Sequence, residues 1–385
     1  MASVTFPIPL GGDGSTVTDD SNASTGLANG GHRTRFVPAL SQVVNIANTF
    51  VANASIAAAN TASAFRNKLI NGDFQVWQRG TTFTDPTGLA TMYTADRWAA
   101  FRGAWTAGIT VTKQNVQANS SSIRVQRNSG NTSTAVMQLN QSFETIDVKK
   151  LAGKTVTLQV KALKGANFSA VSSALTVQIV YGTGTDGNLG SGFTGSTAAG
   201  TLAATLTTTN ALFTLTAAIP ANATQLAVQM SYTPDGTMGA AGAADYFEVT
   251  DVQLEEGSVA TSFERRPYGL ELGLCQRYFV RLVDKTSNHS IGNGVAISAT
   301  GMQLQRFFGV EMRIAPALVL SGAANFICIN ASGGTAGTAT AITLGLTKTN
   351  CVRFDVSVAS GLVAGNAASC QSQNTSATLD LSAEL

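Results

Sequence analysis

Histidine and charge are both scarce in this sequence. Only two of the 385 residues are His, and 12% are charged. Nucleophilic catalysis of the Ser/His/Asp kind needs a histidine base, whereas His32 lies in a glycine-rich segment and His289 in a polar loop. The 24 basic residues nearly balance the 22 acidic ones, and no cluster of five or more Lys or Arg occurs. We therefore expect neither an enzyme of this type nor a nucleic-acid partner.

Long apolar runs and closely spaced cysteines are missing as well. Residues 37–65 carry no charge but contain five amide side chains, more than a membrane helix would tolerate. No segment near the start has the apolar core of a secretory signal, so we expect folding in the cytosol. Cys275, Cys328, Cys351 and Cys370 lack the short spacings of zinc or redox sites. They are predicted to be reduced and mostly buried, with a disulfide framework as the alternative.

The first third of the chain has two parts without β pattern. Residues 1–36 alternate glycine with Ser, Thr, Asp and Asn, which predicts an extended arm. Residues 37–66 are predicted to form an amphipathic helix of about eight turns that begins near Pro38. Because this stripe needs a partner, we expect identical helices to bundle, with packing on the next domain as the alternative. The predicted seam is Leu40, Val43, Ala47, Phe50 and Ala54.

The rest of the sequence is mainly β. In Lys154–Ala162 the apolar residues occupy alternate positions, which is the pattern of a strand with one buried face. Eight or nine such strands, separated by Gly, Asn and Ser turns, predict a jelly-roll β-sandwich over residues 67–268. A short linking helix is predicted over residues 269–283, and a smaller C-terminal β-sandwich over residues 284–385.

Several motifs resemble a module that recurs in tail fibres and other appendages of tailed bacteriophages. The resemblance runs in matching order over roughly residues 67–280, which makes it more specific than any one motif. The motifs are Leu69–Gly80, Thr94–Trp98, Asp251–Gly257, Ala260–Tyr268 and Leu274–Tyr278. Residues 26–38 are similar to the virion-proximal start of such fibres, and Met312–Pro316 and Ser382–Leu385 to their C-terminal domains.

The resemblance implies a homotrimeric virion protein assembled in the host cytoplasm. Its arm would bind the phage tail, a portal adaptor or another virion protein, and the C-terminal domain would face the host. The anchor residues would be Gly30, His32, Arg33, Arg35 and Phe36. The expected function is attachment to a host-surface glycan or lipopolysaccharide, without catalysis or membrane insertion. Two alternatives are a head or collar decoration fibre and a glycan depolymerase.

The jelly roll of this family is similar to carbohydrate-binding modules, which implies two further sites. Aromatic rings stack on sugar rings, so Trp77, Trp98, Trp105 and Tyr93 are candidates for glycan contact, with packing in the core as the competing interpretation for the tryptophans. No catalytic residue or cofactor is expected. A structural calcium would lie between Asp251 and the position of Gln75, which is a weak neutral ligand that Asp73 could replace.

Overall fold

The computed structural model describes residues 3–5, 15–18, 39–49, 65–84, 91–102, 108–117, 120–330 and 334–385. The chain divides into two compact units, Met1–Arg66 and Asn67–Leu385. In the first unit, strand β1 (Ser3–Thr5) pairs with β2 (Thr16–Thr18), and residues 39–49 are helical. None of the helices in these described ranges is long and apolar enough to cross a membrane.

The helical segment leaves its apolar side chains in solvent. Leu40 and Val43 are each 54% exposed, and Ala47 is exposed too. The remaining predicted seam residues, Phe50 and Ala54, lie outside the described residues. The predicted bundle of three helices therefore stays a prediction.

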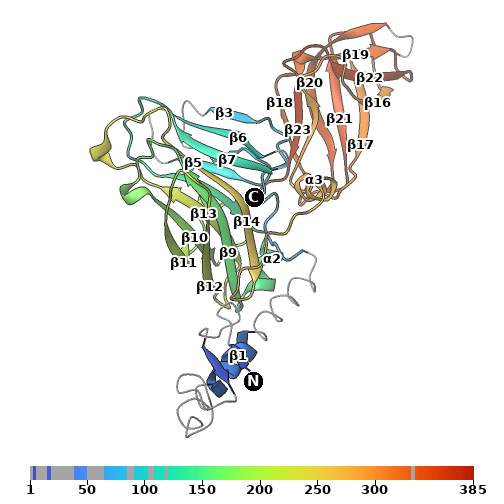
Figure 1. Ribbon diagram of the computed structural model, residues 1–385. Coiled ribbons are helices and arrows are strands. Elements are labelled where there is room, and N and C mark those ends of the chain that lie inside the picture. The colour runs from blue at the N-terminus through green and yellow to red at the C-terminus, as the bar shows by residue number, and fades with distance from the viewer. Residues whose placement is uncertain are drawn as a thin grey trace. The chain divides into compact units, whose positions relative to one another are not determined.

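Two six-stranded antiparallel sheets form the first part of the second unit (Figure 1). One sheet has the order β11-β10-β13-β8-β5-β4 and the other β12-β9-β14-β7-β6-β3. This arrangement confirms the predicted mainly-β sandwich. The strands are β3 (Thr82–Thr84), β4 (Met92–Tyr93), β5 (Ala99–Arg102), β6 (Ile109–Gln117), β7 (Ser120–Arg127), β8 (Met137–Ser142), β9 (Thr155–Lys164), β10 (Ala174–Gly182), β11 (Thr197–Thr205), β12 (Ala211–Ala218), β13 (Gln225–Tyr232) and β14 (Tyr246–Glu256).

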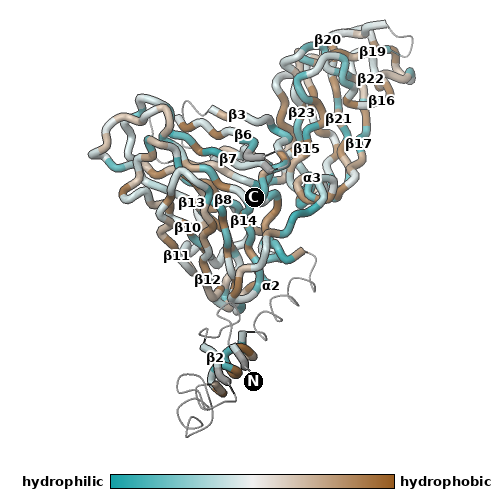
Figure 2. The backbone as a smooth tube through the Cα atoms, viewed as in Figure 1, coloured by the Kyte–Doolittle hydropathy of each residue, from teal (hydrophilic) through white to brown (hydrophobic). Residues whose placement is uncertain are grey.

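The core lies between these sheets and follows from the alternation of side chains. Val156, Leu158 and Val160 of β9 point into it, as do Phe247 and Val249 of β14, and all five are buried. Figure 2 shows this alternation as changes of hydropathy along the strands. Helix α2 (Thr145–Leu151) follows β8 and adds Val148 and Leu151 to the same core.

The C-terminal part contains a closed barrel where a second sandwich was expected. Its strand order is β16-β17-β21-β20-β19-β22, and β16 pairs with both β17 and β22, which closes the ring. A separate three-stranded sheet has the order β15-β23-β18. The strands are β15 (Phe279–Asp284), β16 (Ser290–Ala296), β17 (Gly301–Phe307), β18 (Ala317–Leu320), β19 (Phe326–Asn330), β20 (Thr335–Thr347), β21 (Cys351–Val358), β22 (Ala367–Ser372) and β23 (Thr378–Ser382).

Two predicted boundaries differ from the structure. The linking helix α3 spans Tyr268–Gln276, and residues 279–283, expected at its end, belong to β15. Phe279 pairs with Ser382 of β23, so these residues belong to the sheet and not to the helix. The glycine-rich composition of residues 182–200 predicts a long loop, but the loop is shorter, because β11 begins at Thr197 and pairs with β10.

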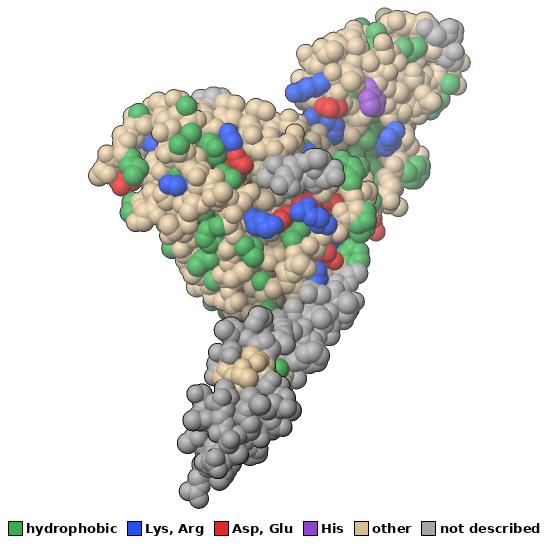
Figure 3. All heavy atoms as spheres, in the orientation of Figure 1, with side chains coloured by type: hydrophobic (Ala, Val, Ile, Leu, Met, Phe, Trp, Pro, Cys, Tyr) green, Lys and Arg blue, Asp and Glu red, His purple; other side chains and the backbone are tan. Residues whose placement is uncertain are grey.

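The surface carries few charged side chains. Figure 3 shows them scattered singly or in small groups among hydrophobic and uncharged polar residues on the visible face. This matches the composition, in which charged residues are 12% of the chain. This face therefore presents mainly uncharged groups to the solvent.

Candidate functional site

A row of uncharged polar side chains crosses the outer face of the β11-β10-β13-β8 region. The strand register places Thr201, Gln178, Gln229 and Asn140 side by side on four neighbouring strands. Their neighbours along the chain point into the core, so these side chains point away from it. The next row has Thr176, Ser231 and Gln138 in register. We call these seven residues the amide face.

Hydrogen bonds hold much of the amide face in one geometry. Gln178 Nε2 donates to Thr201 Oγ1 at 3.0 Å. Gln229 Nε2 donates to Gln178 Oε1 and to Ser231 Oγ, both at 3.2 Å. The amide groups are therefore oriented before any ligand arrives, which lowers the entropy lost on binding.

Asn140 is the exception within this network. Its side chain is fully buried, yet neither Nδ2 nor Oδ1 has a hydrogen-bond partner. A buried unpaired polar group costs about 1–3 kcal/mol. Such a group points to a missing partner, and one buried water molecule, which both donates and accepts, would satisfy the amide.

The loop between β10 and β11 borders the amide face at the Ser142 end. Leu189 N donates to Ser142 Oγ at 3.0 Å, and Asn188 Nδ2 donates to the Tyr93 hydroxyl at 2.8 Å. Phe193 packs with Val180 and Ala227 in a small apolar cluster. The loop is thus fixed to the sheet at this end.

Of the predicted aromatic candidates, Trp77 and Trp98 lie in the core, and Tyr93 lies beside the loop at the Ser142 end of the amide face. Trp98 is fully buried and donates from Nε1 to Asn71 O, and Trp77 is 9% exposed and donates to Phe74 O. Tyr93 donates to Leu385 O at 2.9 Å, and burial raises the pKa of its hydroxyl to about 12. Both tryptophan rings belong to the core of the sandwich, and Tyr93 is partly buried. Trp105 lies outside the described residues.

The residues considered for calcium carry their own counter-charges. Asp251 Oδ2 accepts from Lys161 Nζ at 2.8 Å, and Asp251 Oδ1 accepts from Arg265 at 3.1 Å. Gln75 donates its amide to Asp73, and Arg265 lies 3.8 Å from that carboxylate. No group of three or more metal-binding side chains occurs among the described residues. Because two cationic side chains already occupy the carboxylate oxygens, this arrangement does not fit a calcium ion.

Other predicted residues can be placed only in part. The five anchor residues Gly30, His32, Arg33, Arg35 and Phe36 lie outside the described ranges. His289 is exposed in the loop before β16, and its Nδ1 is 3.4 Å from Thr286 Oγ1. Glu255 is buried and accepts from Thr261, whereas Glu256 pairs with Lys154 at the surface. These two adjacent glutamates therefore do not form a catalytic pair.

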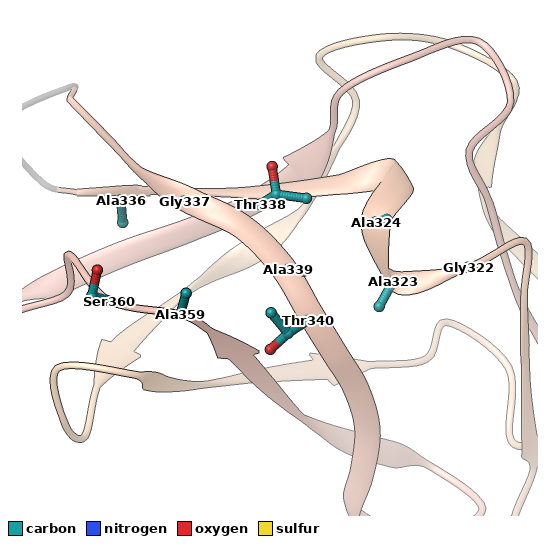
Figure 4. A pocket seen from close by; sticks show the side chains of 10 residues that line it. All are labelled: Gly322, Ala323, Ala324, Ala336, Gly337, Thr338, Ala339, Thr340, Ala359 and Ser360. Carbon is teal, nitrogen blue, oxygen red and sulfur yellow. The ribbon is translucent and has the colours of Figure 1, made fainter.

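A hollow of about 670 Å³ lies beside β20 in the barrel (Figure 4). Its wall consists only of small residues, and it contains no carboxylate, aromatic ring or basic group. Strand β20, the 3-10 turn Ala323–Asn325 and the residues after β21 contribute to it. It provides space and a few hydroxyl groups, but fewer polar contacts than the amide face. Its lining residues are Gly322, Ala323, Ala324, Ala336, Gly337, Thr338, Ala339, Thr340, Ala359 and Ser360.

Sequence comparison finds no relative: no protein-family model and no curated protein matches the chain. Among solved structures, it is similar to the enzymatically active domain of tailspike protein 4 of bacteriophage CBA120. The identity is 12% over 51% of this chain and 22% of that chain, with a TM-score of 0.31.

Carbohydrate-binding modules are similar over a comparable part of the chain. A CBM4 module matches at 16% identity over 49% of this chain and 98% of its own, with a TM-score of 0.30. A xylan-binding domain from CBM22 matches at 15% identity over 47% and 99%, with a TM-score of 0.29. At these scores the similarity carries no conclusion about function, which has to rest on the chain's own residues.

Proposed function

We propose that this protein is a non-enzymatic attachment protein of a bacteriophage virion, and that its amide face binds a host-surface glycan. The hydrogen-bonded amide and hydroxyl groups of Gln178 and Thr201, which solvent reaches, and of Gln229 beside them carry the proposal. The sequence motifs supply the virion setting. The C-terminal barrel faces the host in the same proposal, with the arm at the virion.

The chemistry of the amide face favours a neutral sugar. Amide groups donate and accept hydrogen bonds, as sugar hydroxyls do, so each can pair with the other. No side chain of the amide face is charged. A strongly anionic ligand would find no ion-pair partner among these seven residues, so we expect preference for the neutral segments of a capsule or lipopolysaccharide.

Binding should be lost when the amide face is truncated. The variant Gln138→Ala, Gln178→Ala, Gln229→Ala should bind purified host polysaccharide at least about tenfold more weakly, because it loses several hydrogen bonds of roughly 1 kcal/mol each. Binding is measured by titration calorimetry, with released oligosaccharide assayed in the same samples. The matched control is Gln114→Ala, Gln126→Ala, which removes amides from β6 and β7 of the other sheet.

Three results would contradict the proposal. If the triple variant binds as tightly as the wild type, the amide face is not the glycan site. If the control variant loses binding equally, the effect is one of folding. Release of oligosaccharide by the wild-type protein would show a depolymerase instead.

Trimer formation belongs to the same proposal and has its own test. Val43→Asp combined with Phe50→Asp would place three like charges at two levels of an apolar seam, which is strongly unfavourable. The variant should lose its helical bundle and form a weaker trimer, as measured by circular dichroism and sedimentation. A wild-type protein that sediments as a monomer at micromolar concentration would rule out the bundle, as would an equally stable variant trimer.

A further inference from the structure

Two cysteines of the barrel lie directly opposite each other on neighbouring strands. Cys328 of β19 pairs in register with Cys370 of β22, and both are fully buried in the barrel core. Both are free thiols, and they hydrogen-bond to each other. Sequence spacing gave no sign of this pair, because its members are 42 positions apart.

The position of the pair within the ladder suits a covalent bond. In antiparallel sheets, hydrogen-bonded and non-hydrogen-bonded pairs alternate. Gln373 N donates to Asn325 O at 2.9 Å, so Asn325 and Gln373 form a hydrogen-bonded pair. The next pair along the ladder is Phe326 with Ser372. By alternation, Phe326–Ser372 is a non-hydrogen-bonded pair and Ile327–Gln371 a hydrogen-bonded one. Cys328 and Cys370 are therefore a non-hydrogen-bonded pair.

Backbone hydrogen bonds on the opposite side of β22 also show that Cys328 and Cys370 are a non-hydrogen-bonded pair. Ser372 N donates to His289 O, and Ser372 O accepts from Asn288 N, so the backbone polar groups of Ser372 point away from β19. Cys370 lies two residues away and has the same orientation. At non-hydrogen-bonded pairs the Cα atoms are about 4.5 Å apart, which lies within the range that a disulfide spans without backbone movement.

We propose that Cys328 and Cys370 are an oxidation site that forms a cross-strand disulfide once the protein leaves the reducing cytosol. Hydrogen peroxide, which is about as small as two water molecules, is a suitable oxidant for a buried pair. The Cys328 sulfur attacks one peroxide oxygen and becomes a sulfenic acid, and the first water leaves with the thiol proton. The Cys370 sulfur then attacks the sulfenic sulfur, the S–S bond forms, and its proton leaves with the hydroxyl as the second water. Two thiols are oxidised and one peroxide is reduced.

The contact between the two thiols also affects their ionisation. The Cys370 thiol donates its hydrogen bond to the Cys328 sulfur, and this lowers the pKa of Cys328 and raises that of Cys370. Because the thiolate is the nucleophile, we assign the first attack to Cys328, and the Cys370→Ser variant below tests this order. The other two cysteines lack such a partner in their register: Cys351 pairs with Phe307, and Cys275 lies in α3.

Peptide mapping tests the inference. The purified, folded protein is treated with hydrogen peroxide, its remaining thiols are alkylated, and it is digested without a reductant. We expect one peptide that joins Cys328 to Cys370, while Cys275 and Cys351 stay unlinked. The thermal midpoint of the oxidised protein should rise by several degrees and return after unfolding in reductant. In Cys370→Ser, Cys328 should be trapped as a sulfenic acid by dimedone.

A second experiment covers slow access to the buried thiols. The reduced, unfolded protein is refolded in a glutathione redox buffer and mapped in the same way, with Cys351→Ser as the matched control that should still form the bridge. If both preparations keep Cys328 and Cys370 as free thiols, or if either residue bridges to Cys351 or Cys275, the proposal is overturned.

Discussion

Replacing Glu384 by Gln should lower the free energy of unfolding of the 67–385 unit by about 3–5 kcal/mol, as expected when one partner of a buried ion pair is removed. Arg97 is 3% exposed and forms an ion pair with the Glu384 carboxylate, which also lies 3.0 Å from Arg79. Each guanidinium stacks on an aromatic ring, Arg97 on Tyr278 at 3.5 Å and Arg79 on Phe279 at 3.4 Å. Without the carboxylate, Arg97 would keep its charge in a site that water does not reach.

Denaturant unfolding followed by tryptophan fluorescence measures this effect, because Trp77 and Trp98 are buried in the same unit. The control is Glu256→Gln, whose ion pair with Lys154 is 2.8 Å long but about half exposed. Its loss should change stability by less than about 1 kcal/mol. If Glu384→Gln and Glu256→Gln lower the free energy of unfolding equally, burial does not determine how much Glu384 contributes to stability.

Asp245→Ala should destabilise the sandwich by a similar amount, about 3–5 kcal/mol. Asp245 is fully buried and accepts hydrogen bonds from Arg127 at 3.2 Å, from Ser169 N and Oγ at 3.0 and 2.8 Å, and from Tyr232 at 3.3 Å. Burial and the nearby Asp245 carboxylate raise the pKa of Tyr232, so its hydroxyl stays a donor. The substitution leaves three donors and one buried positive charge without their acceptor.

The Arg353–Asp355 pair supplies the control for this variant. Its separation of 3.0 Å is similar, but about a third of each side chain is exposed, so Asp355→Ala should have a small effect. The double variant Arg127→Met, Asp245→Leu should be less destabilised than Asp245→Ala, because no unpaired charge remains. If the double variant is less stable than Asp245→Ala, the unpaired charge of Arg127 is not the cause of the destabilisation.

The sandwich could be predicted because apolar and polar residues alternate along its strands. The alternation in β9 and β13 is a local property, and the alternating apolar residues of both strands pack into the core. Closure of the barrel could not be predicted, because it depends on β16 pairing with β22, where Ser290 lies opposite Gln371. An alternating pattern indicates that a strand has one buried face and one exposed face, but it does not determine which strand lies beside it. Phe279 and Leu282 fit helical spacing, but residues 279–284 pair with β23, and this pairing makes the segment a strand.

The amide face was missed for a related reason. Amides at outward positions of a strand normally indicate a solvated surface, and Gln138, Gln178 and Gln229 are far apart in sequence. Only the register brings them together with Asn140. The available signal was that amide or hydroxyl groups occupy alternate positions in β8 and β13. The sequence reasoning followed aromatic residues instead, and Trp77 and Trp98 stabilise the core.

The barrel also bears on how copies of this chain can crowd together. A free sheet edge offers unpaired N–H and C=O groups to which a strand of a neighbouring molecule can add, and this is a common route to aggregation. In the ring β16-β17-β21-β20-β19-β22 every strand has a neighbour on both sides. If many copies are held close together, they can therefore touch through their barrels without merging these sheets, and each barrel keeps its own fold at high local concentration.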